Sequence, residues 1–401
     1  MSKLEQLIAE LCPDGVEYKK IKEVYMRIKG TPITAGKMKE IENPAGDIRV
    51  FAGGKTVINA FEEDIPNANI TRVPAVLVQS RGVIDAIYYD KAFTFKNEMW
   101  AYTAENPITV KFLYYVLKNN VQQFRDAASG MGALPQISLP VTEEFVIPVP
   151  PLEVQREIVR ILDNFTELTA ELTAELTAEL TARKKQYEYY KSKLFVFDNS
   201  TVEMKPLERE FSFIRNGFVG TATPYYTDKD KGVRYLKGTN IHNGIISDNE
   251  EEYITQEFHQ KHIRNQLKSD DILVVQSGHV GECAVVGQKY AGANCHALII
   301  MSNDGNCNSK YVAYYLQTPE GKQKLARITT GGTIKHILAS GMKKLVVPFP
   351  SIDIQNQIVS ILDRFDALCN DISTGLPAEI EARQKQYEYY RDKLLTFKEL
   401  S

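Results

Sequence analysis

The chain is poor in the residues that mark several common classes of protein. It holds 5 cysteines and 1 tryptophan in 401 residues, and no two cysteines form a CxxC pair. An odd number of scattered cysteines favours free thiols in a reducing cytoplasm over a disulfide framework. No apolar run approaches the roughly 18 residues of a membrane span, and Glu5 and Glu10 interrupt the apolar pattern at the N-terminus. We therefore expect a cytoplasmic protein with no signal peptide and no membrane role.

A strong excess of charge of one sign is also missing. The net charge is -3, and the contents of 43% hydrophobic and 25% charged residues are ordinary for a soluble globular protein. Lys and Arg outnumber Asp and Glu by 18 to 14 over residues 205–347, but only by 15 to 14 over residues 20–147. Because a whole-chain charge hides a local basic face, composition neither indicates nor excludes a nucleic-acid partner.

The familiar catalytic motifs are absent or incomplete. Residues 53–56, GGKT, end like a phosphate-binding loop, but Arg49 stands where that loop requires a glycine. His259 and His262 lack the further ligands of a zinc site at finger spacing. No GxGxxG sequence joins a strand to a helix, and no NPPF/Y-type loop is present. We therefore expect a non-catalytic chain with no metal site and no cofactor of its own.

What the chain does contain is a long internal duplication. IPVPPLEVQREIVRILDNFTEL at 147–168 recurs as VPFPSIDIQNQIVSILDRFDAL at 347–368, and ARKKQYEYYKSKL at 182–194 recurs as ARQKQYEYYRDKL at 382–394. Both matches keep one register without a gap. A repeat of this period indicates two copies of one structural unit, related by a pseudo-twofold axis.

The segments that precede these repeats predict two similar domains of mixed α/β class. ILVVQSG at 272–278 matches VLVQSRG at 76–82, and SKYVAYYLQT at 309–318 matches TVKFLYYVLK at 109–118. Glycine-rich turns follow each helical run, with Gly331-Gly332-Thr333 answering Gly130-Met131-Gly132. The sequence between these anchors hardly matches, so we expect two domains that share a fold but differ in surface.

The repeated segments themselves predict long helices. Pro150 and Pro151 mark an entry, and apolar residues then recur at helical spacing as far as Phe197. An unbroken helix from Leu152 to Phe197 would have about 46 residues and a length of roughly 70 Å. Such a helix needs a mate for its apolar face, and the second copy would supply it as an antiparallel coiled-coil partner. The residues expected in the helix pair, or in a partner-docking surface, are Ile158, Leu162, Phe165, Tyr187, Tyr190, Ile358, Leu362, Phe365, Tyr387 and Tyr390.

A low-complexity segment, TAELTAELTAEL at 169–180, lies between the two apolar stripes of the first copy. Each four-residue unit advances a helix by about 400° and about 6 Å, so successive leucines drift by about 40° around the axis. We interpret the segment as a spacer whose length varies by whole units. The second copy carries Gly375 and Pro377 in the corresponding stretch, which predicts a kink or a break.

The duplicated helical openers, the two dissimilar domains and the TAEL repeat together resemble the specificity subunits of type I restriction–modification enzymes, and the resemblance covers essentially the whole chain. Val154 and Ile354 stand where many relatives have Glu, a small departure. The resemblance implies four regions. They are a first target-recognition domain with a short N-terminal segment at 1–147, a first helical spacer at 148–198, a second target-recognition domain at 199–347, and a second helical spacer at 348–401.

The resemblance also implies a function. Each target-recognition domain would read one half of a bipartite, asymmetric site on double-stranded DNA. The helices would act as a ruler and as a dock for two methyltransferase (modification) subunits, which carry S-adenosylmethionine and methylate adenine. Restriction subunits would add translocation and cleavage driven by ATP with Mg. The TAEL repeat resembles the subgroup in which the number of units sets the spacing of the half-sites.

We expect the DNA contacts to come from polar and basic residues near turn signals, because such loops protrude. Any one of these charges could instead be ordinary solvated surface, and the matched Ser80 and Ser277 could reflect a shared fold alone. Two other readings stay open: a scaffold of two binding modules tethered by a coiled coil that does not act on DNA, and an enzyme with an unrecognised site. The candidate DNA-binding residues are Arg27, Lys29, Arg49, Lys55, Arg81, Lys96, Arg215, Lys229, Lys231, Arg234, Lys237, Asn240, His279 and Lys335.

Overall fold

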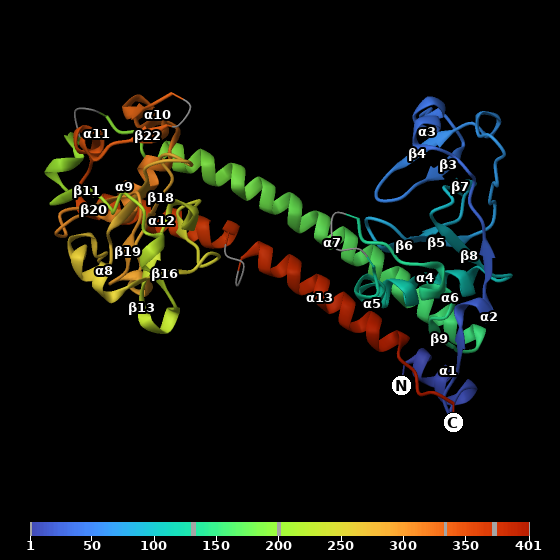
Figure 1. The fold of residues 1–401 in the computed structure, drawn as a ribbon. Helices are drawn as coiled ribbons and strands as arrows, with labels where there is room; N and C mark the ends of the chain where they lie inside the picture. The colour runs from blue at the N-terminus through green and yellow to red at the C-terminus, as the bar shows by residue number, and fades with distance from the viewer. Residues whose placement is uncertain (1, 130–133, 199–201, 333–334, 371–374, 401) are drawn as a thin grey trace. The chain divides into compact units, whose positions relative to one another are not determined.

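The computed structural model of the chain describes residues 2–129, 134–198, 202–332, 335–370 and 375–400. It divides into two compact units, and both are of mixed α/β class, as expected (Figure 1). Unit 1 comprises Met1–Leu176 and Glu379–Ser401, and unit 2 comprises Thr177–Ala378. The division falls within one continuous helix, so each unit takes part of that helix.

Unit 1 is built around two small sheets and a two-stranded ladder. The four-stranded sheet has the order β2-β8-β5-β6, the three-stranded sheet has the order β4-β3-β7, and β1 pairs with β9. The central strand β5 is buried along its whole length, as its AVLVQ sequence predicts for a strand covered on both faces. The strands are β1 (Glu17–Lys20), β2 (Met26–Ile28), β3 (Ile48–Phe51), β4 (Val57–Ala60), β5 (Ala75–Gln79), β6 (Asp85–Tyr89), β7 (Phe93–Phe95), β8 (Trp100–Thr103) and β9 (Val146–Val149).

The helices of unit 1 cover the four-stranded sheet and its edges. Helix α4 begins at Pro107 behind the Asn106 cap and packs on β5 and β6 through buried residues that include Phe112 and Leu113. Trp100 is buried in the same apolar core, so it is a core residue as its isolation in the sequence suggested. The helices that precede the long one are α1 (Lys3–Leu11), α2 (Ile21–Val24), α3 (Ala35–Ile41), α4 (Pro107–Asn119), α5 (Val121–Asp126) and α6 (Leu139–Glu143).

Unit 2 repeats this plan with extra short strands. The sheet β11-β20-β17-β18 corresponds to β2-β8-β5-β6, and β10 pairs with β23 as β1 pairs with β9. A second sheet, β12-β16-β13-β19, keeps the parallel pair seen between β3 and β7 in its pair β13 and β19. The strands are β10 (Glu203–Pro206), β11 (Phe213–Asn216), β12 (Tyr226–Thr227), β13 (Gly232–Leu236), β14 (Ile241–His242), β15 (Ile245–Ile246), β16 (Glu252–Thr255), β17 (Ile272–Val275), β18 (Cys283–Val285), β19 (Asn294–Cys295), β20 (Leu298–Ser302), β21 (Thr329–Thr330), β22 (His336–Ile337) and β23 (Val346–Phe349).

The helices of unit 2 also follow the expected match. Helix α9 begins behind the Asn308 cap and packs on β18, in the place that α4 takes in unit 1. The helices are α8 (Gln256–Lys261), α9 (Ser309–Gln317), α10 (Pro319–Ile328) and α11 (Ala339–Lys344). The shared core fold of the two domains is therefore confirmed, whereas the second sheet of unit 2 is larger than its counterpart.

The long helices largely follow the sequence prediction. Helix α7 (Leu152–Lys193) is continuous for 42 residues and includes the whole TAEL segment. It ends four residues before Phe197, because the chain turns at Leu194 and Phe195 is buried in the core of unit 2. The second copy is broken as expected: α12 (Ile352–Asn370) ends before Gly375, and α13 (Leu376–Leu395) begins with Pro377 in its first turn.

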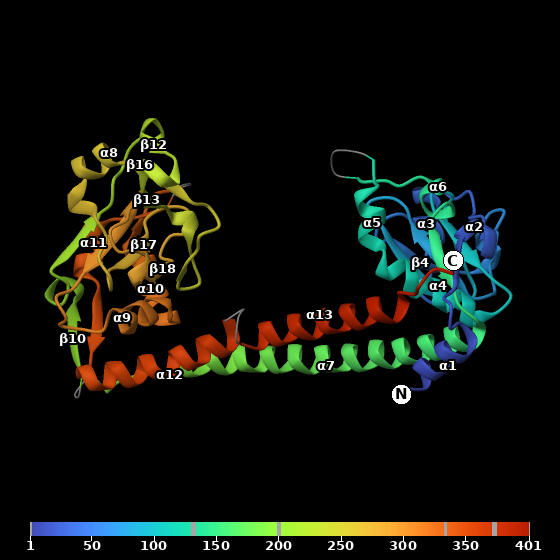
Figure 2. The ribbon, with the colours of Figure 1, turned by 90° about the horizontal axis from the view of Figure 1, so that it is seen from below.

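Each unit contains an antiparallel pair of these helices, and Figure 2 shows them side by side. In unit 1, the Phe165 ring of α7 stacks on Tyr390 of α13 with 5.9 Å between centroids, and the Thr166 hydroxyl lies 3.0 Å from that of Tyr387. In unit 2, Tyr190 of α7 stacks on Phe365 of α12 at 5.7 Å. The expected pairing of the two repeats is thus present within each unit.

Two further expectations concern cysteine and membranes. All five cysteines are free and buried, and burial raises the pKa of Cys283, Cys295 and Cys307 to about 12. Within the described ranges, no helix combines the length and the apolar character needed to cross a membrane.

Candidate nucleic-acid interface

Each recognition domain is fastened to its long helix by the same polar cluster. In unit 1, Asp163 of α7 pairs with Lys111 at 2.7 Å and accepts a hydrogen bond from the Tyr115 hydroxyl at 2.5 Å. Burial and the bond to the carboxylate raise the pKa of Tyr115 well above its usual value. The cluster anchors α4, which packs on the central strands of the sheet, so it fixes the orientation of the domain on the helix.

Unit 2 reproduces the cluster at the matched positions. Asp363 of α12 pairs with Lys310 at 2.8 Å and accepts a hydrogen bond from Tyr314 at 2.7 Å. Burial, followed by the bond to Asp363, raises the pKa of Tyr314 in the same way. The lysine and tyrosine come from matched helices, which explains why the helical runs of the two domains resemble each other while their loops do not.

The loops that end the central strands lie beside the segment that leads into the long helix. In unit 1 the backbone N–H of Ile137 donates to the Ser80 carbonyl at 2.9 Å, and Arg81 bridges to Gln136. In unit 2 the N–H of Ile337 donates to the Gln276 carbonyl at 3.0 Å, and Ser277 bridges to His336. The predicted glycine turn at 130–132 and Thr333 of its counterpart lie outside the described residues.

A cleft of about 590 Å³ opens beside these loops in unit 1. It brings two of the predicted cations, Arg27 and Lys29, together with the side-chain amides of Asn69, Asn97 and Gln136. Amides can donate to and accept from base edges, and cations can contact phosphates. The amides were missed by the sequence reading, which searched mainly for charge; their only signal was their place beside Gly30 and the end of a strand.

The other predicted cations of unit 1 differ in how far they are engaged. Lys55 and Arg81 are exposed, and neither side chain has an ion pair within the described residues. Lys96 pairs with Glu98 at 2.9 Å, and Arg27 reaches Glu143 at 3.3 Å. Arg49 lies on β3 and donates to the Asn59 side chain at 2.9 Å.

In unit 2, the predicted residues on the second sheet are held mainly by internal partners. Lys229 pairs with Glu251 at 2.8 Å, Lys237 pairs with Glu252, and Lys231 lies 4.0 Å from Asp228. Arg234 donates to the carbonyls of Tyr235 and Glu252 at 3.2 and 3.1 Å. These groups neutralise one another across β13 and β16, so this sheet presents little free positive charge.

Two predicted residues of unit 2 are placed in the interior and serve the fold. Asn240 is 1% exposed, and its amide donates to the carbonyls of Ser247 and Glu250 while its oxygen accepts from the Lys237 N–H. Arg215 lies over the Phe213 ring on β11, with its Nε buried and no hydrogen-bond partner found for that atom. The turn signals near both residues were read correctly, but they do not say which way a side chain points.

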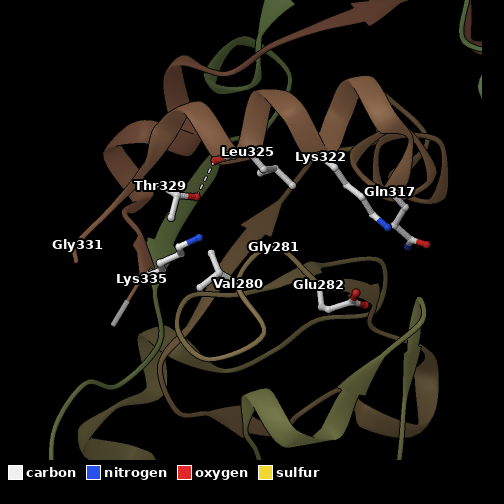
Figure 3. A pocket seen from close by; sticks show the side chains of 10 residues that line it. Val280, Gly281, Glu282, Gln317, Lys322, Leu325, Thr329, Gly331 and Lys335 are labelled. Atoms are coloured by element: carbon white, nitrogen blue, oxygen red, sulfur yellow. Dashed lines mark hydrogen bonds between the residues drawn. The ribbon is translucent and has the colours of Figure 1, made fainter. Parts of the chain in front are cut away.

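The remaining two predictions of unit 2 lie at a second cleft, of about 440 Å³, shown in Figure 3. Lys335 lines it, and the exposed His279 immediately precedes the lining residue Val280. The opposite wall carries Lys322, Gln317 and Glu282, which the sequence reading did not select. Neither lysine has an ion pair within the described part of the chain, so the cleft offers two cations together with a carboxylate and an amide.

The corresponding place in unit 1 is closed. Asp85 and Lys118, which align with Glu282 and Gln317, form an ion pair at 2.7 Å. The neutral Gln317 cannot neutralise Glu282 in that way. The two domains therefore present different polar groups from matching frames, as the dissimilar loop sequences predicted.

The predicted helix-pair residues fall into two groups. Ile158, Leu162, Ile358 and Leu362 are buried in the unit cores, and Tyr187 is also buried. The exposed edges of the aromatic stripe belong to the others, and Tyr189 and Tyr389, which were not selected, are more exposed than any of these. The residues left partly accessible are Phe165, Tyr190, Phe365, Tyr387 and Tyr390.

Comparison with known proteins decides between the open readings. Residues 13–182 and 213–382 each match the family described as type I restriction modification DNA specificity domain. The chain belongs to this family. The two matched segments are 200 residues apart, which is the period of the duplication. Its relatives are named specificity subunits, in agreement with the expectation of a non-catalytic chain.

Two curated relatives illustrate the match. The chain is 31% identical over 382 residues to the EcoR124I/EcoR124II specificity subunit of Escherichia coli, with 87% of each chain covered. It is 33% identical over 321 residues to a putative type I restriction enzyme specificity subunit of Haemophilus influenzae, covering 76% of this chain and 77% of the relative.

Solved structures support the fold. A chain from a study of the assembly of the type I R-M system superposes with a TM-score of 0.65 at 14% identity, covering 96% of this chain and 98% of that one. The HsdS subunit from Thermoanaerobacter tengcongensis gives a TM-score of 0.56 at 13% identity, with 96% and 97% covered.

Proposed function

We propose that the chain is the DNA-specificity subunit of a type I restriction–modification complex, in which each recognition domain reads one half of a bipartite, asymmetric site. The observation that carries the proposal is the tandem family match on two domains of one fold. A reader of two different half-sites needs this combination: one frame used twice, with different polar groups on each copy. The ion pair of Asp85 with Lys118 in unit 1 and the open Glu282 in unit 2 are such a difference.

Within this function, the exposed and unpaired cations are assigned to the DNA backbone. Lys29, Lys55 and Arg81 would contact phosphates of the first half-site, and Lys322 and Lys335 those of the second. Cations position a protein on the duplex, whereas amides and carboxylates in the grooves distinguish bases. Base reading would therefore fall to Asn97 and Gln136 in the first domain. His279, Glu282 and Gln317 would take it in the second.

The long helices are assigned to spacing and assembly. Each TAEL unit rotates a helix by about 40° beyond a full turn, close to the roughly 36° twist of one base pair, so a change of one unit would alter the spacer by a small whole number of base pairs. The matched helical surfaces would dock two methyltransferase subunits, which bring S-adenosylmethionine and methylate adenine. Restriction subunits that use ATP and Mg would then join in the cytoplasm.

The decisive experiment maps methylated adenines in cells that express this chain with its methyltransferase subunit. The expected result is one bipartite sequence with a fixed spacer. Removing Thr173–Leu176 should keep both half-site sequences and shorten the spacer between them. Unchanged spacing would refute the ruler, and the absence of site-specific methylation would favour the tethered scaffold that does not act on DNA.

A further inference from the structure

The outer face of α12 in unit 2 carries an uncovered apolar stripe. Ile354, Ile361 and Leu368 are spaced by seven residues, so they lie on one side of the helix. Their side chains are 42%, 40% and 37% exposed. Gln357, which is also exposed, lies between the first two. No element in the described part of unit 2 packs over this stripe.

Unit 1 provides a matched comparison at the start of α7. Val154 and Glu157 occupy the positions that correspond to Ile354 and Gln357, yet they are only 0% and 3% exposed. The difference is the amphipathic helix α1. Its Lys3 pairs with Glu157 at 2.9 Å, and its Leu4 belongs to the same apolar cluster as Val154.

The difference between the units is confined to this outer face. On the inner face, Ile158 and Leu162 are buried in unit 1, and their counterparts Ile358 and Leu362 are equally buried in unit 2. Helix α1 precedes β1, but the described residues that precede β10 form no such helix. The same surface is therefore covered by a helix in one unit and bare in the other.

We propose that the bare face of α12 receives an amphipathic helix of the methyltransferase subunit, in the manner in which α1 covers α7. The inference rests on the proposed function. The charges at the two ends of the stripe define the occupant further. Asp353 and Arg364 are exposed and have no ion pair within the described residues, so the incoming helix should present a basic side chain to the first and an acidic one to the second.

A second copy of this chain does not meet the requirement. Its α1 is already seated on its own α7, and releasing it would expose the buried Leu4 and Glu157. The loss would oppose the gain, because the two faces are alike. A separate subunit pays no such cost. The two docking positions are therefore unequal, since only the one on unit 2 offers this additional surface.

The test uses the full chain and the purified methyltransferase subunit, with two variants of equal charge change. Ile361→Lys places a cation in the centre of the stripe, and Ala367→Lys places one on an exposed position about 100° around the same helix. Both positions are exposed, so both variants should fold, which circular dichroism checks. Subunit binding is followed by light scattering and by titration of labelled methyltransferase subunit.

The expected result is that Ile361→Lys weakens the binding of one of the two methyltransferase subunits by at least about tenfold, while Ala367→Lys binds as the unaltered chain does. A photo-reactive side chain at Gln357 should crosslink to a helical peptide of that subunit. Equal binding by both variants, or crosslinking only to another copy of this chain, overturns the inference while leaving the proposed function in place. If the unaltered chain binds no methyltransferase subunit, the proposed function fails as well.

Discussion

The polar cluster at Asp163 is predicted to decide how firmly the first recognition domain is held. Replacing Asp163 by Ala removes a half-exposed ion pair with Lys111 and the hydrogen bond from Tyr115. The ion pair is worth about 0.5–1 kcal/mol and the charged hydrogen bond about 1.5–2 kcal/mol. The expected loss in the free energy of unfolding of unit 1 is therefore about 2–3 kcal/mol.

The assay exploits the composition of the chain. Trp100 is the sole tryptophan, and it is buried in the core of unit 1. Tryptophan fluorescence during urea unfolding thus reports on unit 1, whereas circular dichroism reports on both units. Asp163→Ala should lower the fluorescence midpoint, and the matched Asp363→Ala should leave it in place while lowering a transition seen by circular dichroism.

Two outcomes would refute this reasoning. If the fluorescence transition of Asp163→Ala coincides with that of the unaltered chain, the cluster does not stabilise the joint. If Asp363→Ala shifts the fluorescence as strongly as Asp163→Ala, the units do not unfold separately. A double-mutant cycle with Tyr115→Phe should show a coupling of about 1 kcal/mol or more between Tyr115 and Asp163.

Three further predictions concern charge and thiols. Lys335→Ala and Lys322→Ala should each reduce by about one the slope of log affinity against log salt, measured for the assembled complex on its DNA site; an unchanged slope removes them from the backbone contacts. Arg160 and Lys3 hold the pKa of Glu157 down to about 2, so its contribution to stability is fully present above about pH 4.5 and is lost as the pH falls toward 2. Glu157→Gln should therefore lower stability at pH 7 and have progressively less effect during acid unfolding, whereas a constant difference would contradict the pairing. Because all five cysteines are buried, a thiol reagent at pH 8 should modify fewer than one in the native chain and five in denaturant.

The duplication made much of the architecture predictable from sequence. The ungapped repeat located two domains of one fold, and the helical spacing located α7 and the pair that it forms. Gly375 and Pro377 predicted the break between α12 and α13, because proline cannot continue a helix ladder.

The candidate site was harder to predict, because a turn signal gives a backbone position without a side-chain direction. Asn240 and Arg234 lie near turns as expected, yet both point inward and satisfy carbonyls. Glu282 and Gln317 were missed because the feature that distinguishes them is relational. They are notable only beside the Asp85–Lys118 pair of the other unit.

The two units also differ in how their chain segments are ordered, and this bears on synthesis. Unit 2 is a contiguous stretch, but unit 1 needs both ends of the chain. The N–H of Val16 donates to the Lys398 carbonyl and the N–H of Leu400 to the Val16 carbonyl, each at 2.9 Å, and the Tyr18 hydroxyl donates to the Phe397 carbonyl. The first domain to leave the ribosome must therefore wait for the last residues made before it can close, while the second can fold as soon as it emerges.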